Sequence, residues 1–330
     1  MKESTNAGYT DAGSPDQRWI AAVLRVVLRT TLRRTFRAGL SVEQQRLRLQ
    51  RVTRLTLPPR GASFTAATVG GVPGEWVRVR GHERPSLSLL YLHGGGYTTG
   101  SPATHRALTG HLAARCNARV FAADYRLAPE HPFPAALDDA VASWRGLMGE
   151  GLDADRVAIA GDSAGGGLAV ATALRLRALG EPMPRALVLF SPWVDLTLER
   201  LSAAPPGEVM LTLPWVRECA GSYVGRADSR HPLISPVEAD LGGLPPTLVQ
   251  VGTDELLLPD SRRLCERMRA AGTPAELSEF PGRWHVFQAN AGVLADADRA
   301  LEAVGRFLGD APAPSEPPST RRPVAAQNAG

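Results

Sequence analysis

The stretch that most constrains this chain runs from Arg156 to Val170 and reads RVAIAGDSAGGGLAV. Its first part, Val157 to Ala160, is a run of small apolar residues that predicts a buried strand. A tight turn through Gly161, Ser163 and Gly165 follows, and an Ala- and Leu-rich segment then predicts a helix. A strand, a G-x-S-x-G turn and a helix in this order indicate a serine that is held out as a nucleophile. The alternative interpretation is a Gly-rich turn with an ordinary serine.

A serine nucleophile needs a base, and the base needs a carboxylate that orients it. His285 lies in a loop between the last expected strand and the last expected helix, where the base stands in the order Ser, acid, His. Asp254 follows an apolar strand and precedes the histidine by one helix and one strand, so we expect it to be the acid. Asp195 also follows a strand and stays open as the alternative. Asp162 is expected to point elsewhere on the tight turn.

Three consecutive glycines follow the most apolar of the expected strands. They let the backbone turn its N–H groups inward, and we expect Gly94, Gly95 and Gly96 to form an oxyanion hole there, with Gly95 and Gly96 as the main donors and Gly94 shaping the turn. The N–H of Ala164, at the start of the helix after the serine, should complete the hole. The run lacks the lysine and the spacing of a phosphate-binding loop. His93 is expected to brace this loop by hydrogen bonds.

Strands and helices alternate from about residue 60 onward, which argues for an α/β fold with a mostly parallel sheet covered by helices on both faces. The chain has 330 residues, of which 44% are hydrophobic, so it can bury a sizeable core. Its 37 basic and 33 acidic residues nearly balance, and we expect no nucleic-acid partner. Cys116, Cys219 and Cys265 are far apart, without metal-like spacing, which favours a reducing, cytoplasmic compartment.

The pattern divides the chain into an α/β core and helical segments outside it. We expect the core at 56–195 and 231–309, a helical cap at 18–55 and 196–230, a flexible N-terminus at 1–17 and a disordered, Pro-rich tail at 310–330. Residues 18–37 predict an amphipathic, Arg-rich helix that packs over the rest of the protein. Arginines interrupt its apolar run, so we expect no membrane span and no strong membrane contact. A helix lying on a membrane surface is the less favoured alternative.

Several motifs together resemble the hormone-sensitive-lipase-like family of α/β-hydrolases over roughly residues 60–310. They are HGGG at 93–96, DYRLAPEHPFPAALDD at 124–139, GDSAGGGLA at 161–169, SPWVDL at 191–196 and GTDELLLPD at 252–260. The resemblance implies a triad of Ser163, Asp254 and His285, oxyanion donors at Gly95, Gly96 and Ala164, and a helical cap. Where the family often has Asp-Pro-Leu, this chain has Asp254-Glu255-Leu256.

The resemblance further implies a serine hydrolase that cleaves carboxylic esters, of short to medium acyl length and acetyl type, through an acyl-enzyme. Bacterial members of the family include deacetylases of antibiotic biosynthesis, so an N-acetyl substrate is the alternative. A membrane-associated lipase and a catalytically inactive binding protein are less favoured. The expected partner is a small molecule, an oligomer is left open, and the mechanism needs neither metal nor organic cofactor. The residues expected to line the pocket are Tyr97, Trp193, Trp215 and Trp284.

Overall fold

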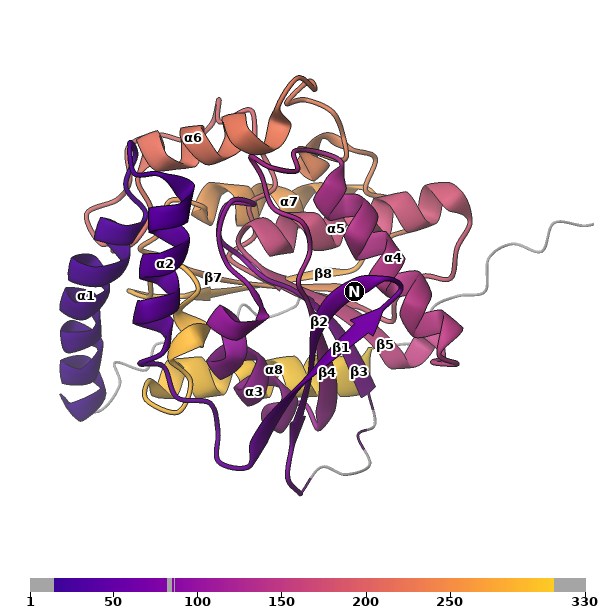
Figure 1. Ribbon diagram of the computed structural model, residues 1–330, viewed down its shortest axis with the longest axis horizontal. Coiled ribbons are helices and arrows are strands. Elements are labelled where there is room, and N and C mark those ends of the chain that lie inside the picture. Colours follow the sequence, from indigo (N-terminus) through magenta and orange to yellow (C-terminus); the bar gives the residue numbers. More distant parts are fainter. Residues whose placement is uncertain (1–14, 82–84, 86, 312–330) are drawn as a thin grey trace, which may run out of the picture.

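The computed structural model describes residues 15–81, 85 and 87–311, and its strands form one twisted sheet (Figure 1). The strands are β1 (Ala62–Val69), β2 (Val72–Val79), β3 (Leu87–Leu92), β4 (Ala118–Ala123), β5 (Val157–Asp162), β6 (Leu187–Phe190), β7 (Thr247–Gly252) and β8 (Ala275–Phe280). Their order across the sheet is β1-β2-β4-β3-β5-β6-β7-β8. β2 pairs antiparallel with both of its neighbours, whereas β3 to β8 are all parallel. The expected mostly parallel sheet is confirmed.

Helices flank the sheet in the described part of the chain. They are α1 (Pro15–Thr35), α2 (Val42–Thr53), α3 (Arg106–Arg115), α4 (Ala135–Gly149), α5 (Ala164–Leu179), α6 (Leu213–Val224), α7 (Leu258–Ala270) and α8 (Ala295–Asp310), with short 3-10 turns η1 (Pro102–His105), η2 (Ala154–Arg156), η3 (Pro236–Glu238) and η4 (Phe287–Asn290). The sequence predicts a last helix from Ala291 to Leu308, and this helix begins four residues later, at Ala295. The reason is that η4 and a left-handed Gly292, with a φ of 83°, turn the chain before it.

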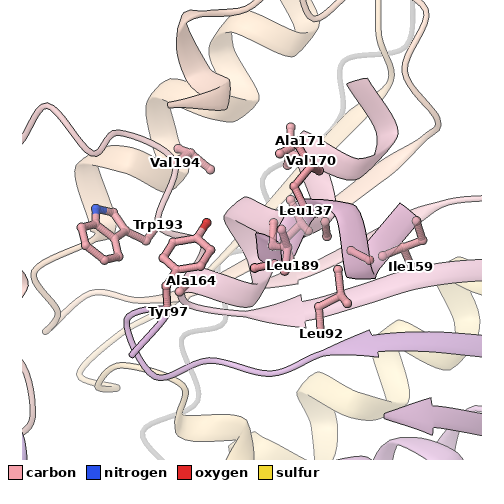
Figure 2. Packing of buried hydrophobic residues seen from close by; sticks show 14 of the residues in the cluster. Leu92, Tyr97, Leu137, Ile159, Ala164, Val170, Ala171, Leu189, Trp193 and Val194 are labelled. Carbon is pink, nitrogen blue, oxygen red and sulfur yellow. The ribbon is translucent and has the colours of Figure 1, made fainter. Parts of the chain in front are cut away.

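Alternate side chains of the central strands enter two separate apolar cores. On β3, Leu90 and Leu92 belong to the core that also holds buried residues of α4, α5 and α7, whereas Leu89 and Tyr91 belong to the core that holds buried residues of α3 and α8. Figure 2 shows the first core, in which strand side chains lie beneath residues of α5. A strand that is covered on both faces needs apolar residues at nearly every position, which explains its continuous LSLLYL run.

The parallel strands bring their carboxyl ends to one edge of the sheet. The loop after β3 carries Gly94–Gly96, and the turn after β5 carries Ser163. The loops after β7 and β8 carry the pair Asp254-Glu255 and His285. The edge at which ligands bind in sheets of this kind therefore holds the candidate nucleophile, the candidate base, the two adjacent carboxylates and the glycine-rich loop.

Three helices outside the α/β core contact one another near this edge. In Figure 1, α1 and α2 lie side by side and α6 runs across their ends. Trp215 of α6 donates its indole N–H to the side-chain oxygen of Gln45 on α2 at 2.7 Å. Its ring also packs against Phe36, directly after α1, with 4.6 Å between centroids. We propose that these three helices form one cap, and we call them the cap helices.

The ends of the chain differ slightly from expectation. The first helix begins at Pro15, so residues 15–17 are helical, and the last helix runs to Asp310. The remaining residues of the expected flexible N-terminus, 1–14, lie outside the described residues, as does the tail from 312 to 330. In the described part of the chain, no helix is both long and apolar enough to cross a membrane.

Candidate active site

Ser163 lies in the sharp turn between β5 and α5. Its φ of 53° is rare for a residue with a side chain, and its N–H donates to the Phe190 carbonyl at 2.8 Å. A Cβ on Gly161 would come within 2.3 Å of the Gly165 carbonyl oxygen, and one on Gly165 within 1.9 Å of the Leu92 carbonyl oxygen. Both glycines are therefore required by the close approach of backbone around the serine.

Ser163 and His285 line one apolar cavity of about 130 Å³ between the sheet edge and the cap helices. Trp215 and Trp284 also line it, as expected. Tyr97 and Trp193 are buried in the core below the turn and are not among its lining residues, so that part of the expectation is wrong. A larger cavity of about 710 Å³ lies at the opposite, amino-terminal end of the strands, where neither the serine nor the histidine is present.

Glu255 orients the imidazole of His285. The distance from Nδ1 of the histidine to Oε2 of the glutamate is 2.6 Å, and both side chains are almost completely buried. The other carboxylate oxygen accepts the Gly252 N–H at 3.0 Å. Since an ionised carboxylate only accepts hydrogen bonds, Nδ1 carries the proton and Nε2 is left as the basic nitrogen. The arrangement can therefore remove a proton from a hydroxyl group in the cavity.

The expectation that Asp254 orients the histidine is wrong. Its carboxylate accepts a hydrogen bond from Arg25 of α1 at 2.8 Å, and about a third of its side chain (32%) is exposed. Asp195, the alternative, pairs with Arg263 at 2.8 Å and is also not in contact with the histidine. Asp254 and Glu255 are adjacent, so the turn after β7 directs one carboxylate outward to α1 and the other inward.

The sequence places a leucine two residues after each of the two acids. An Asp-Pro-Leu pattern has its acid two residues before a leucine, and here Leu256 follows Asp254 by two residues while Leu257 follows Glu255 by two. The pattern alone does not distinguish the two carboxylates.

Burial and neighbouring charge shift the pKa of His285 in opposite directions. Burial by itself lowers the pKa of His285, but the hydrogen bond and the charge of Glu255 outweigh it, and the pKa lies above its usual value. Burial raises the pKa of the Glu255 carboxyl group, and the hydrogen bond from the histidine opposes that change. The charge of the buried Glu208 carboxylate raises the pKa of both His285 and Glu255.

The glycine-rich loop differs from expectation at one position. The N–H of Gly94 donates to Oδ1 of Asp162 at 2.9 Å, so it is not available as an oxyanion donor. Gly95 and Gly96 have φ values of 119° and 63°, which favour glycine. Among the described residues, the N–H groups of Gly95, Gly96 and Ala164 have no acceptor. These three N–H groups form the candidate oxyanion hole.

Asp162 supports this loop from below, a role that the sequence does not reveal. It accepts the Tyr91 hydroxyl at 2.5 Å, and Nε2 of His105 lies 3.5 Å from its other oxygen. Burial raises the pKa of Asp162, but the charge of His105 and the hydrogen bonds outweigh it and lower the pKa below its usual value. His93 braces the same loop, as expected, through a 2.8 Å contact between Nδ1 and the Gly94 carbonyl oxygen. Burial lowers the pKa of His93 to about 3, so its ring is neutral.

Arg25 joins the first cap helix to both loops of the site. Besides Asp254, it donates to the Gly282 carbonyl in the histidine loop and to the Gly207 carbonyl at 3.2 Å. Its guanidinium group lies 5.5 Å from the centroid of the Trp284 ring, next to the histidine. One side chain of α1 therefore connects three segments that are far apart in the sequence.

Glu208 connects the segment before α6 to the acid loop. Its Oε2 accepts the N–H of Leu256 at 2.9 Å, and its Oε1 accepts the N–H of Met210 at 2.7 Å. Two exposed arginines of α1, Arg29 and Arg33, donate to the backbone carbonyls of this segment. The acid loop is thus held from the cap side as well as from the sheet.

A family model described as the alpha/beta hydrolase fold matches residues 89–289. A solved structure of an esterase from the bacterial hormone-sensitive lipase (HSL) family is similar, with a TM-score of 0.82 and 38% sequence identity. The similarity covers 91% of this chain and 99% of that one. The chain belongs to the hormone-sensitive-lipase-like family of α/β-hydrolases.

Relatives of this hydrolase match along most of their own length. A protein from Streptomyces hygroscopicus named acetyl-hydrolase is 46% identical over 243 residues, which cover 73% of this chain and 81% of the relative. A protein from Acinetobacter venetianus named esterase is 34% identical over 284 residues, with coverages of 85% and 93%.

We predict that Glu255→Gln lowers the pKa of His285, because a neutral amide no longer stabilises the imidazolium and burial then dominates. The measurement is a pH titration of histidine-labelled protein by NMR, with the His285 signal assigned by its loss in His285→Asn.

Asp254→Asn is the matched control and should leave the titration unchanged, since that carboxylate faces Arg25. A lowered pKa in Asp254→Asn together with an unchanged one in Glu255→Gln would contradict the assignment.

Proposed function

We propose that the chain is a serine hydrolase that cleaves carboxylic esters of short to medium acyl length, acetyl esters above all. The observation that carries the proposal is the 2.6 Å contact between His285 and Glu255 at the cavity that Ser163 also lines. A serine in a strained turn, a buried base and a buried carboxylate are the three parts of an acyl-enzyme mechanism. The name of the Acinetobacter relative supports an ester substrate, and the name of the Streptomyces relative supports an acetyl group.

In the proposed cycle, Nε2 of His285 takes the proton of the Ser163 hydroxyl as its oxygen attacks the acyl carbonyl. Glu255 keeps the ring oriented and stabilises the imidazolium that forms. The oxyanion accepts hydrogen bonds from the free N–H groups of the candidate oxyanion hole. His285 then protonates the leaving alcohol, and water repeats the same steps on the acyl-enzyme.

The size and lining of the cavity support a short acyl group. A volume of about 130 Å³ is well below the roughly 300–1,000 Å³ of typical ligand pockets. Leu28 and Leu32 of α1 and Trp215 of α6 form its walls on the cap side. An acetyl group fits such a space, whereas a long chain would have to displace cap side chains.

Ser163→Ala is expected to lower kcat for p-nitrophenyl acetate about 10⁶-fold, since the nucleophile is lost. Covalent labelling by a serine-directed fluorophosphonate should disappear, while the melting temperature stays within a few degrees of the wild-type value.

Ser202→Ala changes an exposed serine before α6 and serves as the control, with activity and labelling retained. Labelling of Ser163→Ala, or activity near the wild-type level, would exclude Ser163 as the nucleophile.

Leu32→Ala should enlarge the cavity and raise the ratio of kcat/KM for octanoate over acetate esters by roughly tenfold or more. Val26→Ala, on the exposed side of the same helix, should leave this ratio unchanged. A ratio measured on one preparation does not depend on the fraction of active enzyme. An unchanged ratio in Leu32→Ala would show that α1 does not limit acyl length.

A further inference from the structure

Helix α1 has two apolar faces, although a helix on a protein surface needs only one. Its inner face packs on the protein through Ala21 and Leu32, both buried, and Leu32 lines the cavity beside the serine. Its outer face presents Trp19 and Val26, which are 69% and 64% exposed. Val23 and Val27 are on the same outer side, because residues three, four and seven apart share a helix face.

Exposed apolar side chains are concentrated on this part of the molecule. Nine large apolar side chains are exposed in the described residues, and seven of them lie between residues 19 and 57. These seven are Trp19, Val23, Val26, Val27, Leu47, Leu55 and Leu57. A concentration of this kind, rather than single scattered residues, marks an interaction surface.

The same segment is strongly basic. Residues 17–60 contain eleven arginines and one acidic residue, a net charge of +10, so the rest of the chain has a net charge of −6. Arg34 in the last turn of α1 and Arg37, two residues after that helix, are exposed, as are Arg48 and Arg51 on the neighbouring α2. Apolar and cationic side chains therefore share one surface, which we call the α1–α2 outer surface.

We propose that the α1–α2 outer surface docks on an anionic lipid bilayer, with α1 lying in the plane of the interface. The exposed apolar face of α1 favours this arrangement over the absence of strong membrane contact that the sequence predicts. Trp19 and the valines of the outer face would enter the headgroup region, where an indole ring is favoured. The exposed arginines would contact anionic headgroups, each contributing attraction near the surface. In this mode of binding α1 lies on the bilayer and does not cross it, which agrees with the finding that no described helix is long and apolar enough to span a membrane.

The charge distribution favours lipid over other occupants. A second copy of the chain would bring two surfaces of the same high positive charge together, which repel each other. An acidic protein or nucleic acid would satisfy the arginines but would not require an adjacent stripe of tryptophan and valine. A bilayer with anionic headgroups satisfies both components of the surface.

The position of the surface places the cavity directly behind it. The inner face of α1 contributes Leu28 and Leu32 to the cavity wall, one helix diameter from the outer face. Binding to lipid does not require Ser163 and is independent of the proposed hydrolysis. Failure of one therefore leaves the other standing.

The test is flotation of the full chain with vesicles of phosphatidylcholine alone and with vesicles that contain 30% phosphatidylglycerol. We expect binding to the anionic vesicles, at least tenfold weaker binding to the neutral ones, and weakening by added salt. Trp19→Ser/Val26→Ser and Arg34→Glu/Arg37→Glu should each reduce binding at least tenfold. Brominated lipid should quench wild-type fluorescence more than that of Trp19→Phe.

Two control variants carry the same kinds of substitution outside the α1–α2 outer surface. Leu179→Ser/Val293→Ser alters the other two exposed large apolar residues, and Arg175→Glu/Arg306→Glu alters exposed arginines outside the segment. Both should bind as the wild type does, and all variants should keep its melting temperature. Equal binding to both vesicle types, or wild-type binding by the outer-surface variants, would overturn the proposal. So would a dimer that the outer-surface variants dissociate, with no vesicle binding.

Discussion

The hydrogen bond between His285 and Glu255 is the interaction on which the site depends, and it is costly to maintain. A buried carboxylate needs compensation for its lost hydration, and a second carboxylate, Glu208, lies close enough to raise the pKa of both partners. Backbone N–H groups supply that compensation, from Gly252 to Glu255 and from Met210, Leu211 and Leu256 to Glu208. The loop after β7 therefore supplies each of the two carboxylates with a backbone hydrogen-bond donor of its own.

Helix α1 connects the cap helices to the loops that carry Glu255 and His285. Arg25 bonds the residue before Glu255 and the loop before His285, so a shift of the helix would disturb both partners. The same helix lines the cavity with its inner face and presents apolar and basic residues on its outer face. We infer that the arginines of α1 serve two purposes. Arg25, Arg29 and Arg33 anchor the helix to the segment before α6 by hydrogen bonds, whereas Arg34 in the last turn contributes to the positive charge of the α1–α2 outer surface.

Local patterns predicted the parts of the fold that depend on neighbours in the sequence. The turn at Ser163 is encoded within a few residues, because Gly161 and Gly165 are required by contacts of that same turn. Local patterns do not predict which of Asp254 and Glu255 orients the histidine. Arg25, which is 229 residues away, binds the Asp254 carboxylate, and Glu255 is left to contact His285. Similarly, the N–H of Gly94 is taken by Asp162 across the sheet, which three identical glycines in a row do not reveal.

Turnover of p-nitrophenyl acetate by two variants, Glu255→Gln and Asp254→Asn, tests the central assignment most directly. If Glu255 orients the base, kcat of Glu255→Gln falls by about 10³- to 10⁴-fold, as for loss of the acid in other triads. Asp254→Asn then loses no more than about tenfold, since it removes only the Arg25 ion pair at the surface. The reverse ranking, with Asp254→Asn nearly inactive and Glu255→Gln close to wild type, would contradict the account.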